Sequence, residues 1–137
     1  MSSISRICLC GSMSVLPKML ELRDVFQSKG IEVETPTLEE PIDYSVMPEA
    51  ERAAHKEVMI RNHLERIKKS DVILVVNEDA KGVEGYIGAN SFLEMGFAFA
   101  FDKPIYLLNA IPNQPNKDEL FGLHPTELHG DISILLK

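Results

Sequence analysis

A run of five aliphatic residues, VILVV at 72–76, constrains the fold more than any other feature of this sequence. A strand that is apolar at every position is typical of the centre of a parallel sheet, where helices cover both faces. Three more segments have the apolar, β-branched character of strands, namely ISRICLC (4–10), IEVET (31–35) and PIYLLN (104–109). The sequence therefore predicts a parallel sheet of four to five strands.

The segments between these strands are long enough for crossover helices, and their apolar residues mostly recur at helical spacing. We expect helices over about 14–30, 48–69 and 91–102. The resulting order β-α-β-α-β-α-β predicts an α/β fold with right-handed connections. Further along, 118–123 is expected to form one helical turn, and the apolar end of the tail 124–137 a fifth strand or a docking element.

Length and charge limit the classes of function. A chain of 137 residues suits one domain, 1–137. The net charge of −7 argues against a nucleic-acid polymer or an anionic membrane as partner, since either would require a basic face. No apolar run approaches the ~20 residues that span a bilayer, and the N-terminal residues lack the pattern of a signal peptide. A cytoplasmic location is the resulting expectation.

The chain has two cysteines, Cys8 and Cys10, both on the first predicted strand. We expect them to point to opposite faces of the sheet and to remain reduced. Two cysteines are too few for a metal cage, and no acidic set completes one with the histidines. The sequence therefore predicts neither a metal site nor a cofactor.

Ligands of open parallel sheets bind beyond the carboxyl ends of the strands. This rule selects the segments 11–14, 77–90 and 109–116. Gly11, Ser12 and Met13 join a strand to a helix start, where backbone N–H groups can hold an anion. The alternative is an ordinary β-α turn. Asn109 is a turn residue by default, and a contact with a base or sugar is the functional alternative.

Glu94 is a lone carboxylate in the otherwise apolar and small-residue run GYIGANSFLEMGFAFA (85–100). The spacing Ser91-x-x-Glu94 fits a capping box, which would make the acid structural. Alternatively, Glu94 follows the most buried strand, and a glycine-dotted approach that includes Gly88 lets a ligand reach the backbone. The positive end of the helix dipole would favour its ionised form. An ionised, positioned carboxylate is what covalent glycosyl transfer requires.

Two stretches carry a resemblance to a known family. The runs DVILVVN (71–77) and YIGANSFLEMGFAFAFDKPIYLL (86–108) resemble the nucleoside 2-deoxyribosyltransferase family, whose superfamily includes the 2′-deoxynucleoside 5′-monophosphate N-glycosidases. The shared block is E-x-G-x-A, here residues 94–98, followed by Lys103-Pro104. Upstream, the segment 62–71 also matches in spacing.

The resemblance implies a flavodoxin/Rossmann-like three-layer sandwich that forms a homodimer or a larger homo-oligomer, with each site completed by a neighbour. The implied chemistry is cleavage or transfer at the N-glycosidic bond of a nucleoside or nucleoside 5′-monophosphate, through a covalent glycosyl-glutamate intermediate. Glu94 falls on the nucleophile, and Gly11 and Ser12 fall in the loop that meets the sugar or 5′-phosphate. The phenylalanines of 91–102 exceed what one buried face needs, which favours a subunit contact there.

Three positions differ from the family pattern, and the first is Cys8, where members often carry a tyrosine on the first strand. His63 stands where members carry an aspartate beside Asn62, and Gly88 stands where they carry an aspartate or a serine. A histidine can donate a proton near neutral pH, so Glu94 and His63 are the candidate catalytic pair. The candidate substrate-binding residues are Gly11, Ser12, Met13, Asn62, Tyr86, Gly88, Asn90, Ser91 and Asn109.

Two other functions fit the same residues. In the first, the protein is a nucleotide-binding module without turnover, in which Glu94 grips a ribose hydroxyl and caps its helix. In the second, it is an enzyme similar to the phosphoribohydrolases that release cytokinin bases, because G-x-x-S-x-x-E loosely echoes their site. Those enzymes carry a Pro-Gly-Gly run before the site that this sequence lacks.

Overall fold

The core of the protein is a sheet of five parallel strands, seen in a computed structural model that describes residues 3–36 and 43–137. The strand order is β2-β1-β3-β4-β5, the order of flavodoxin-like folds. Each neighbouring pair is parallel, as the α/β prediction requires. The strands are β1 (Arg6–Cys10), β2 (Glu32–Glu34), β3 (Val72–Val75), β4 (Ile105–Leu107) and β5 (Thr126–Glu127).

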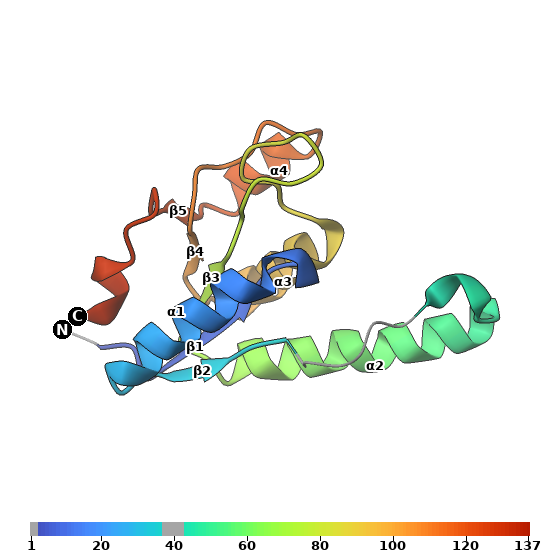
Figure 1. Cartoon of the computed structure of the whole chain (residues 1–137), viewed down its shortest axis with the longest axis horizontal. Coiled ribbons are helices and arrows are strands. Elements are labelled where there is room, and N and C mark those ends of the chain that lie inside the picture. The colour runs from blue at the N-terminus through green and yellow to red at the C-terminus, as the bar shows by residue number, and fades with distance from the viewer. Residues whose placement is uncertain (1–2, 37–42) are drawn as a thin grey trace.

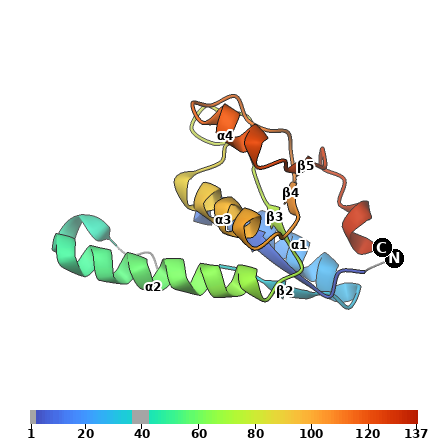
Figure 2. The ribbon, with the colours of Figure 1, turned by 180° about the vertical axis from the view of Figure 1, so that it is seen from behind.

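Helices cover both faces of this sheet (Figure 1), which confirms the predicted α/β, flavodoxin/Rossmann-like sandwich of three layers. The α-helices are α1 (Leu16–Ser28), α2 (Glu49–Lys68), α3 (Ala89–Ala100) and α4 (Lys117–Gly122). Three short 3-10 helices are η1 (Met13–Val15), η2 (Tyr44–Val46) and η3 (Ser133–Leu136). Figure 2 shows the layers from behind, with α2 running beside α3.

Two apolar cores sandwich the sheet. On one face, α1 and η3 pack on the strands, with Phe26 and Leu135 fully buried. On the other face, α2, α3 and α4 contribute Ile67, Met95 and Leu120. β3 is buried at all four of its residues, as expected of a strand with helices on both sides.

Cys8 and Cys10 lie on the same face of the sheet, so the expectation of opposite faces was wrong. Residues two apart on a strand point the same way, because side chains alternate with a period of two. Both thiols are free and buried against the α2 and α3 layer. The Cys10 thiol therefore lies on the side of the sheet that α3, the helix of Glu94, covers.

Two other expectations were inexact. α3 begins at Ala89 rather than at 91, with Gly88 in extended conformation as its N-cap. The fifth strand forms at Thr126–Glu127, whereas the apolar end of the tail forms η3. That segment buries Leu135 in the core on the α1 side of the sheet instead of joining the sheet. Part of the proline-containing loop at 36–50 lies outside the described residues, and 44–46 of it form η2.

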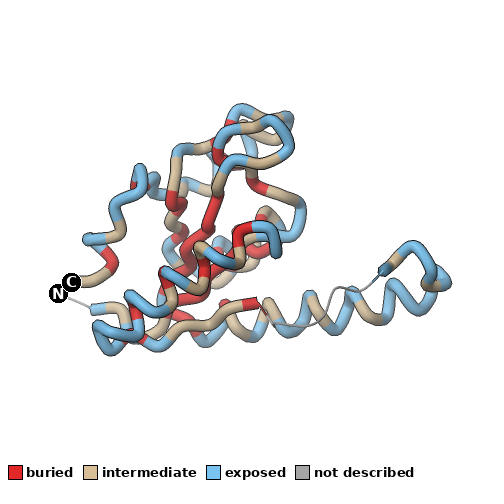
Figure 3. Tube along the Cα trace, in the orientation of Figure 1, coloured by how far each residue is buried: buried red, intermediate tan, exposed pale blue. Residues whose placement is uncertain are grey.

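The N-terminal half of α2 extends away from the sheet, together with η2 (Figure 1). Figure 3 shows this region, residues 43–58, as mostly exposed, and we call it the arm. Within the arm, Tyr44 Oη and His55 Nδ1 lie 3.0 Å apart, and the ammonium of Lys56 sits 4.2 Å from the centre of the tyrosine ring. Val46 and Val58 remain exposed, so the arm has a defined local structure but little apolar cover.

In the described part of the chain, none of the helices combines the length and apolar character that crossing a bilayer requires.

Candidate active site

Glu94 does not cap its helix. Because α3 begins at Ala89, Glu94 is its sixth residue, and no acidic residue lies in the first turn. A capping box requires the acid at the third helical position, which Ser91 occupies here. The capping interpretation and the expected help from the helix dipole were therefore both wrong. Glu94 instead lies on the buried face of α3, together with Ser91, Met95 and Ala98.

The Glu94 carboxylate lies between three elements and is almost completely covered. The residue is 3% exposed. Its neighbours are the thiol of Cys10 at the end of β1, and His63 and Arg66 on α2. The Oε2 atom is buried and has no hydrogen-bond partner. Burying an unpartnered carboxylate oxygen costs free energy, so a feature of this kind in a folded protein calls for a functional explanation.

Burial raises the pKa of Glu94 from 4.5 to about 7. A hydrogen bond from the Cys10 thiol and the charge of Arg66 oppose this rise, but the loss of water dominates. A hydrogen bond with Cys8, burial and, to a smaller extent, the charge of Glu94 hold the pKa of the Cys10 thiol well above its usual range. Glu94 is therefore poised between its acid and carboxylate forms near neutral pH.

His63 is a neutral imidazole in this site, not a cation. Burial lowers its pKa to about 4, and the adjacent charge of Arg66 acts in the same direction. Its Nδ1 lies 2.6 Å from Arg66 Nη2 and 3.6 Å from Glu94 Oε2. The second contact would be an ion pair only if the imidazole were protonated. Because the pKa of His63 is so low, the contact is one between a neutral ring and a carboxyl group.

The turn after β1 leads away from this cluster. Gly11 directly follows Cys10, and a side chain there would collide with Val15, since a Cβ atom would lie 2.8 Å from Val15 Cγ2. Ser12 and Met13 are exposed, and Ser12 Oγ lies 2.5 Å from Ser14 Oγ. These residues stand at the carboxyl end of β1, as the sequence predicted, and their role in binding stays a prediction.

The remaining candidates surround the start of α3 or lie on α2. Ser91 is buried, whereas Asn90 is exposed at the first turn. Tyr86 is half-buried and its ring packs toward Gly88, where an added Cβ would lie 3.6 Å from Tyr86 Cε2. Asn62 precedes His63 on α2, but Asn62 is exposed. Its side chain therefore points away from the buried carboxylate of Glu94.

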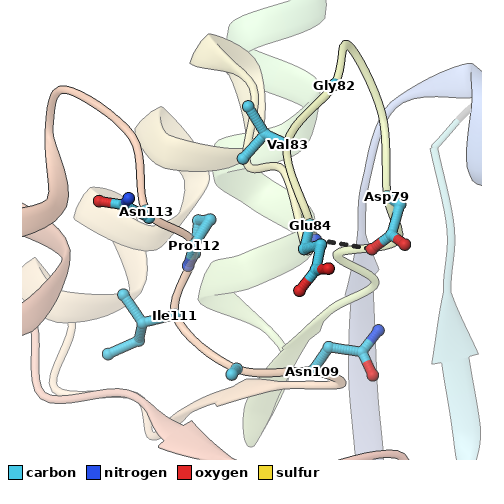
Figure 4. A pocket seen from close by; sticks show the side chains of 10 residues that line it. Asp79, Gly82, Val83, Glu84, Asn109, Ile111, Pro112 and Asn113 are labelled. Atoms are coloured by element: carbon cyan, nitrogen blue, oxygen red, sulfur yellow. Dashed lines mark hydrogen bonds between the residues drawn. The ribbon is translucent and has the colours of Figure 1, made fainter.

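A separate pocket of about 530 Å³ opens beyond β3 and β4 (Figure 4). Two loops form it, 79–85 and 109–113, and Asn109 is the one predicted binding residue among its lining. Asp79 and Glu84 bring carboxylates to the pocket, while Ile111 and Pro112 form an apolar side. Glu94 does not line it. The structure thus separates Asn109 from the candidate nucleophile.

Sequence reasoning overlooked Arg66 and Cys10 as neighbours of Glu94. It also overlooked Asn77, whose side chain hydrogen-bonds to the backbone of Gly85, Ala110 and Asn109 and so joins the two pocket loops. Arg66 could have been found, because residues three apart on a helix are neighbours and His63 was already a candidate. A polar residue that ends a buried strand, as Asn77 does, is a comparable signal. Among the described residues, no group of three or more His, Cys, Asp or Glu side chains is arranged to hold a metal ion.

The arrangement of strands and helices defines an α/β, Rossmann-like protein, and comparison with solved structures agrees. A 2-deoxyribosyltransferase from the psychrotolerant bacterium Bacillus psychrosaccharolyticus is similar, with a TM-score of 0.54, 20% identity, and 74% of this chain and 70% of that chain covered. A conserved protein from Enterococcus faecalis V583 is also similar, with a TM-score of 0.53, 18% identity, and 89% and 76% covered. At these identities the likeness establishes the fold. No family model matches the sequence, and no curated protein matches it.

Proposed function

We propose that this protein cleaves or transfers at the N-glycosidic bond of a nucleoside or nucleoside 5′-monophosphate, with Glu94 as the nucleophile. The observation that carries the proposal is the buried, unpartnered Oε2 of Glu94 at the carboxyl end of β1. The fold shared with a 2-deoxyribosyltransferase supports it, as does the E-x-G-x-A block at 94–98.

In the proposed reaction, a Glu94 carboxylate oxygen attacks C1′ of the sugar while the C1′–N bond breaks. The electron pair of that bond leaves with the base, which takes up a proton. Water or a second base then attacks C1′ and gives up a proton to solvent, and the bond to Glu94 breaks to regenerate the carboxylate. The nucleophile must be ionised, and a pKa of about 7 keeps a substantial fraction in that form at neutral pH.

A ligand must reach Glu94 through the His63 side of the cluster. The side chain of His63 is 15% exposed, whereas that of Glu94 is 4% exposed. The proposal therefore requires that substrate enter past His63, with movement of a covering side chain. Without such an entry, Glu94 would be a buried acid with no access to a sugar.

The decisive experiment is base release from a panel of deoxynucleosides and their 5′-monophosphates, followed by chromatography. The wild-type protein should release free base, and Glu94→Gln should lose at least about 10³-fold of that activity. Glu84→Gln is the matched control, because Glu84 is a carboxylate of the separate pocket. Acid-quenched protein should carry a covalent glycosyl adduct in the mass spectrum, and the adduct should be absent in Glu94→Gln.

One observation favours a second function, a nucleotide-binding module without turnover. The open pocket between 79–85 and 109–113 lies apart from Glu94, so a ligand could bind there without meeting the acid. Ligand-dependent thermal stabilisation with no free base would favour this function, because binding stabilises a protein whether or not it reacts. Loss of that stabilisation in Asn109→Ala, but not in Glu94→Gln, would place the ligand in the pocket.

We also propose that two copies of the chain pair through the outer face of α3. Leu93 is 40% exposed and Phe99 52% exposed, and Gly96 and Ala100 complete an uncharged stripe opposite the buried face. A helix that is apolar on all sides is normally covered on all sides. The arm also lacks apolar cover, but it projects past α3 and away from the sheet (Figure 1), so the proposed contact rests on the α3 stripe alone.

A further inference from the structure

The contact between Arg66 and His63 fixes which nitrogen of the imidazole carries the proton. Arg66 Nη2 lies 2.6 Å from His63 Nδ1. A guanidinium group can only donate, so Nδ1 must accept and its lone pair is occupied. The single proton of the neutral ring therefore resides on Nε2.

The geometry around Glu94 agrees with that tautomer. Glu94 Oε2 lies 3.6 Å from the same Nδ1, which is too long for a hydrogen bond. A protonated Nδ1 would be an obvious partner for this oxygen, yet Oε2 is buried without one. The charged or titratable groups that face His63 are Arg66 from its own helix and Glu94 from α3, with the Cys10 thiol from β1 behind Glu94.

We propose that Arg66 is a positioning residue that holds His63 in the Nε2–H tautomer, so that His63 offers a hydrogen-bond donor to a ligand beside Glu94. Nε2 has no hydrogen-bond partner among the described residues, and the His63 side chain keeps part of its surface exposed. The tautomer itself is independent of catalysis. The role toward a ligand rests on the function proposed above.

In this role the neutral imidazole of His63 donates a hydrogen bond from Nε2–H and keeps that proton. A neutral Nε2–H can bond to the departing base and stabilise the negative charge that develops there as the C1′–N bond breaks. The base then takes its proton from water. This differs from the sequence-based expectation, in which a protonated His63 acts as the acid. In the nucleoside 2-deoxyribosyltransferase family, which the sequence resembles, an aspartate stands at this position. Here a neutral imidazole would take the place of that carboxylate.

The tautomer can be measured directly by NMR on protein with ¹⁵N-labelled histidine, with His63 assigned through its loss in His63→Gln. At pH 7 we expect Nδ1 of His63 to show the shift of an unprotonated nitrogen and Nε2 that of a protonated one. In Arg66→Met, the two nitrogens should move toward averaged shifts and the His63 pKa should rise. Arg61→Met is the matched control, because Arg61 is an exposed α2 arginine that pairs with Glu57. An Nδ1–H tautomer or an imidazolium in the wild-type protein would overturn the proposal, even if Arg66→Met failed to fold.

Activity provides the second test. A glutamine at this position carries its amide nitrogen near the place of Nε2, and an asparagine carries it near Nδ1. We expect H63Q to keep base release within about threefold and H63N to lose about tenfold or more, since a wrong tautomer can be severely damaging. Arg66→Met should also lose about tenfold, and the double variant R66M/H63Q should regain most of that loss. Equal activity of H63Q and H63N would reject the donor role. If the wild-type protein releases no base, the proposed function fails while the NMR result still decides the tautomer.

Discussion

Asn77 and Asn109 bind each other twice. The backbone N–H of Asn109 donates to Asn77 Oδ1 at 2.9 Å, and the side chain of Asn109 donates back to the Asn77 carbonyl at 2.9 Å. Asn77 is 1% exposed, and its amide nitrogen also donates to the carbonyls of Gly85 and Ala110. One buried side chain at the end of β3 thus ties together both loops of the open pocket.

Asn77→Asp should destabilise the protein strongly and disorder that pocket. The change places an acceptor where Asn77 now donates to two carbonyl oxygens, which leaves buried polar groups unsatisfied. We expect a loss of roughly 2–4 kcal/mol in the free energy of unfolding, measured by urea denaturation. Asn113→Asp, on the exposed edge of the same pocket, is the control and should be close to neutral. A near-wild-type midpoint for Asn77→Asp would contradict the described hydrogen bonds.

Gly85→Ala should cost more than Gly82→Ala, although both glycines have positive φ, at +66° and +74°. Each substitution forces alanine into the left-handed region, at about 1–2 kcal/mol. A Cβ on Gly85 would also lie 3.0 Å from the Ala110 carbonyl oxygen, whereas one on Gly82 would meet nothing within 4 Å. The difference in the free energy of unfolding between the two variants, measured by heat or urea, gives the cost of the close approach between the loops 79–85 and 109–113. Equal costs would mean that the loops lie further apart.

Glu94→Gln should stabilise the protein, and more so at higher pH. The folded-state pKa of Glu94 is raised from 4.5 to about 7, so between these values the folded state binds more protons than the unfolded state. The wild-type protein therefore loses stability as pH rises through this window. At about 1.4 kcal/mol per pKa unit, the gain for Glu94→Gln is at most about 3.5 kcal/mol above pH 7 and fades toward pH 4.5. Urea unfolding at pH 5 and pH 8 measures it. A pH-independent difference would show that Glu94 is not desolvated.

His63→Gln should show the opposite pH dependence. The pKa of His63 is lowered from 6.5 to about 4, so the unfolded state binds more protons in that window. The wild-type protein therefore loses stability through His63 as pH falls from 6.5 to 4, and His63→Gln removes this loss. The difference in unfolding midpoint between the two proteins should grow in favour of His63→Gln at acidic pH. His124→Gln, at an exposed histidine, is the control.

Base release should rise with pH through a single ionisation near pH 7. The attacking group must be a carboxylate, and the pKa of Glu94 is about 7. Because the charge of Arg66 lowers that pKa, Arg66→Met should move the midpoint of the pH–rate profile to higher pH. The measurement is kcat/KM from pH 5.5 to 8.5. A profile that is flat across this range would argue against Glu94 as nucleophile.

Phe99→Glu should convert a dimer into a monomer if α3 forms the subunit contact. A charge in the centre of an apolar interface is costly, so dissociation should be visible by light scattering after size exclusion. Phe121→Glu is the matched control, because Phe121 on α4 is exposed to a similar extent (51% against 52%) but lies away from the α3 stripe. A wild-type monomer at high protein concentration, or dissociation by both variants, would refute this contact.

The fold could be predicted from the sequence because its determinants are local. Strands β1, β3 and β4 and helices α1 and α2 follow from apolar runs and helical spacing, and their alternation requires a parallel sheet. The tail shows the limit of such reasoning. Its apolar end could have been a strand, and only tertiary packing decided that Leu135 joins the core from η3 instead.

The site depends on distances that no sequence pattern contains. Glu94 was identified from its block, but the capping interpretation failed because α3 starts two residues earlier and its packing buries the acid. The same packing brought Arg66 and Cys10 to Glu94. It also lowered the pKa of His63 and raised that of Glu94, because both groups lose water only when the helices pack on the sheet. The sequence by itself determined which elements form and that an acid lies among apolar residues. The tertiary structure decided the neighbours, solvation and protonation of that acid, because these arise from contacts between α2, α3 and β1 that are remote in the chain.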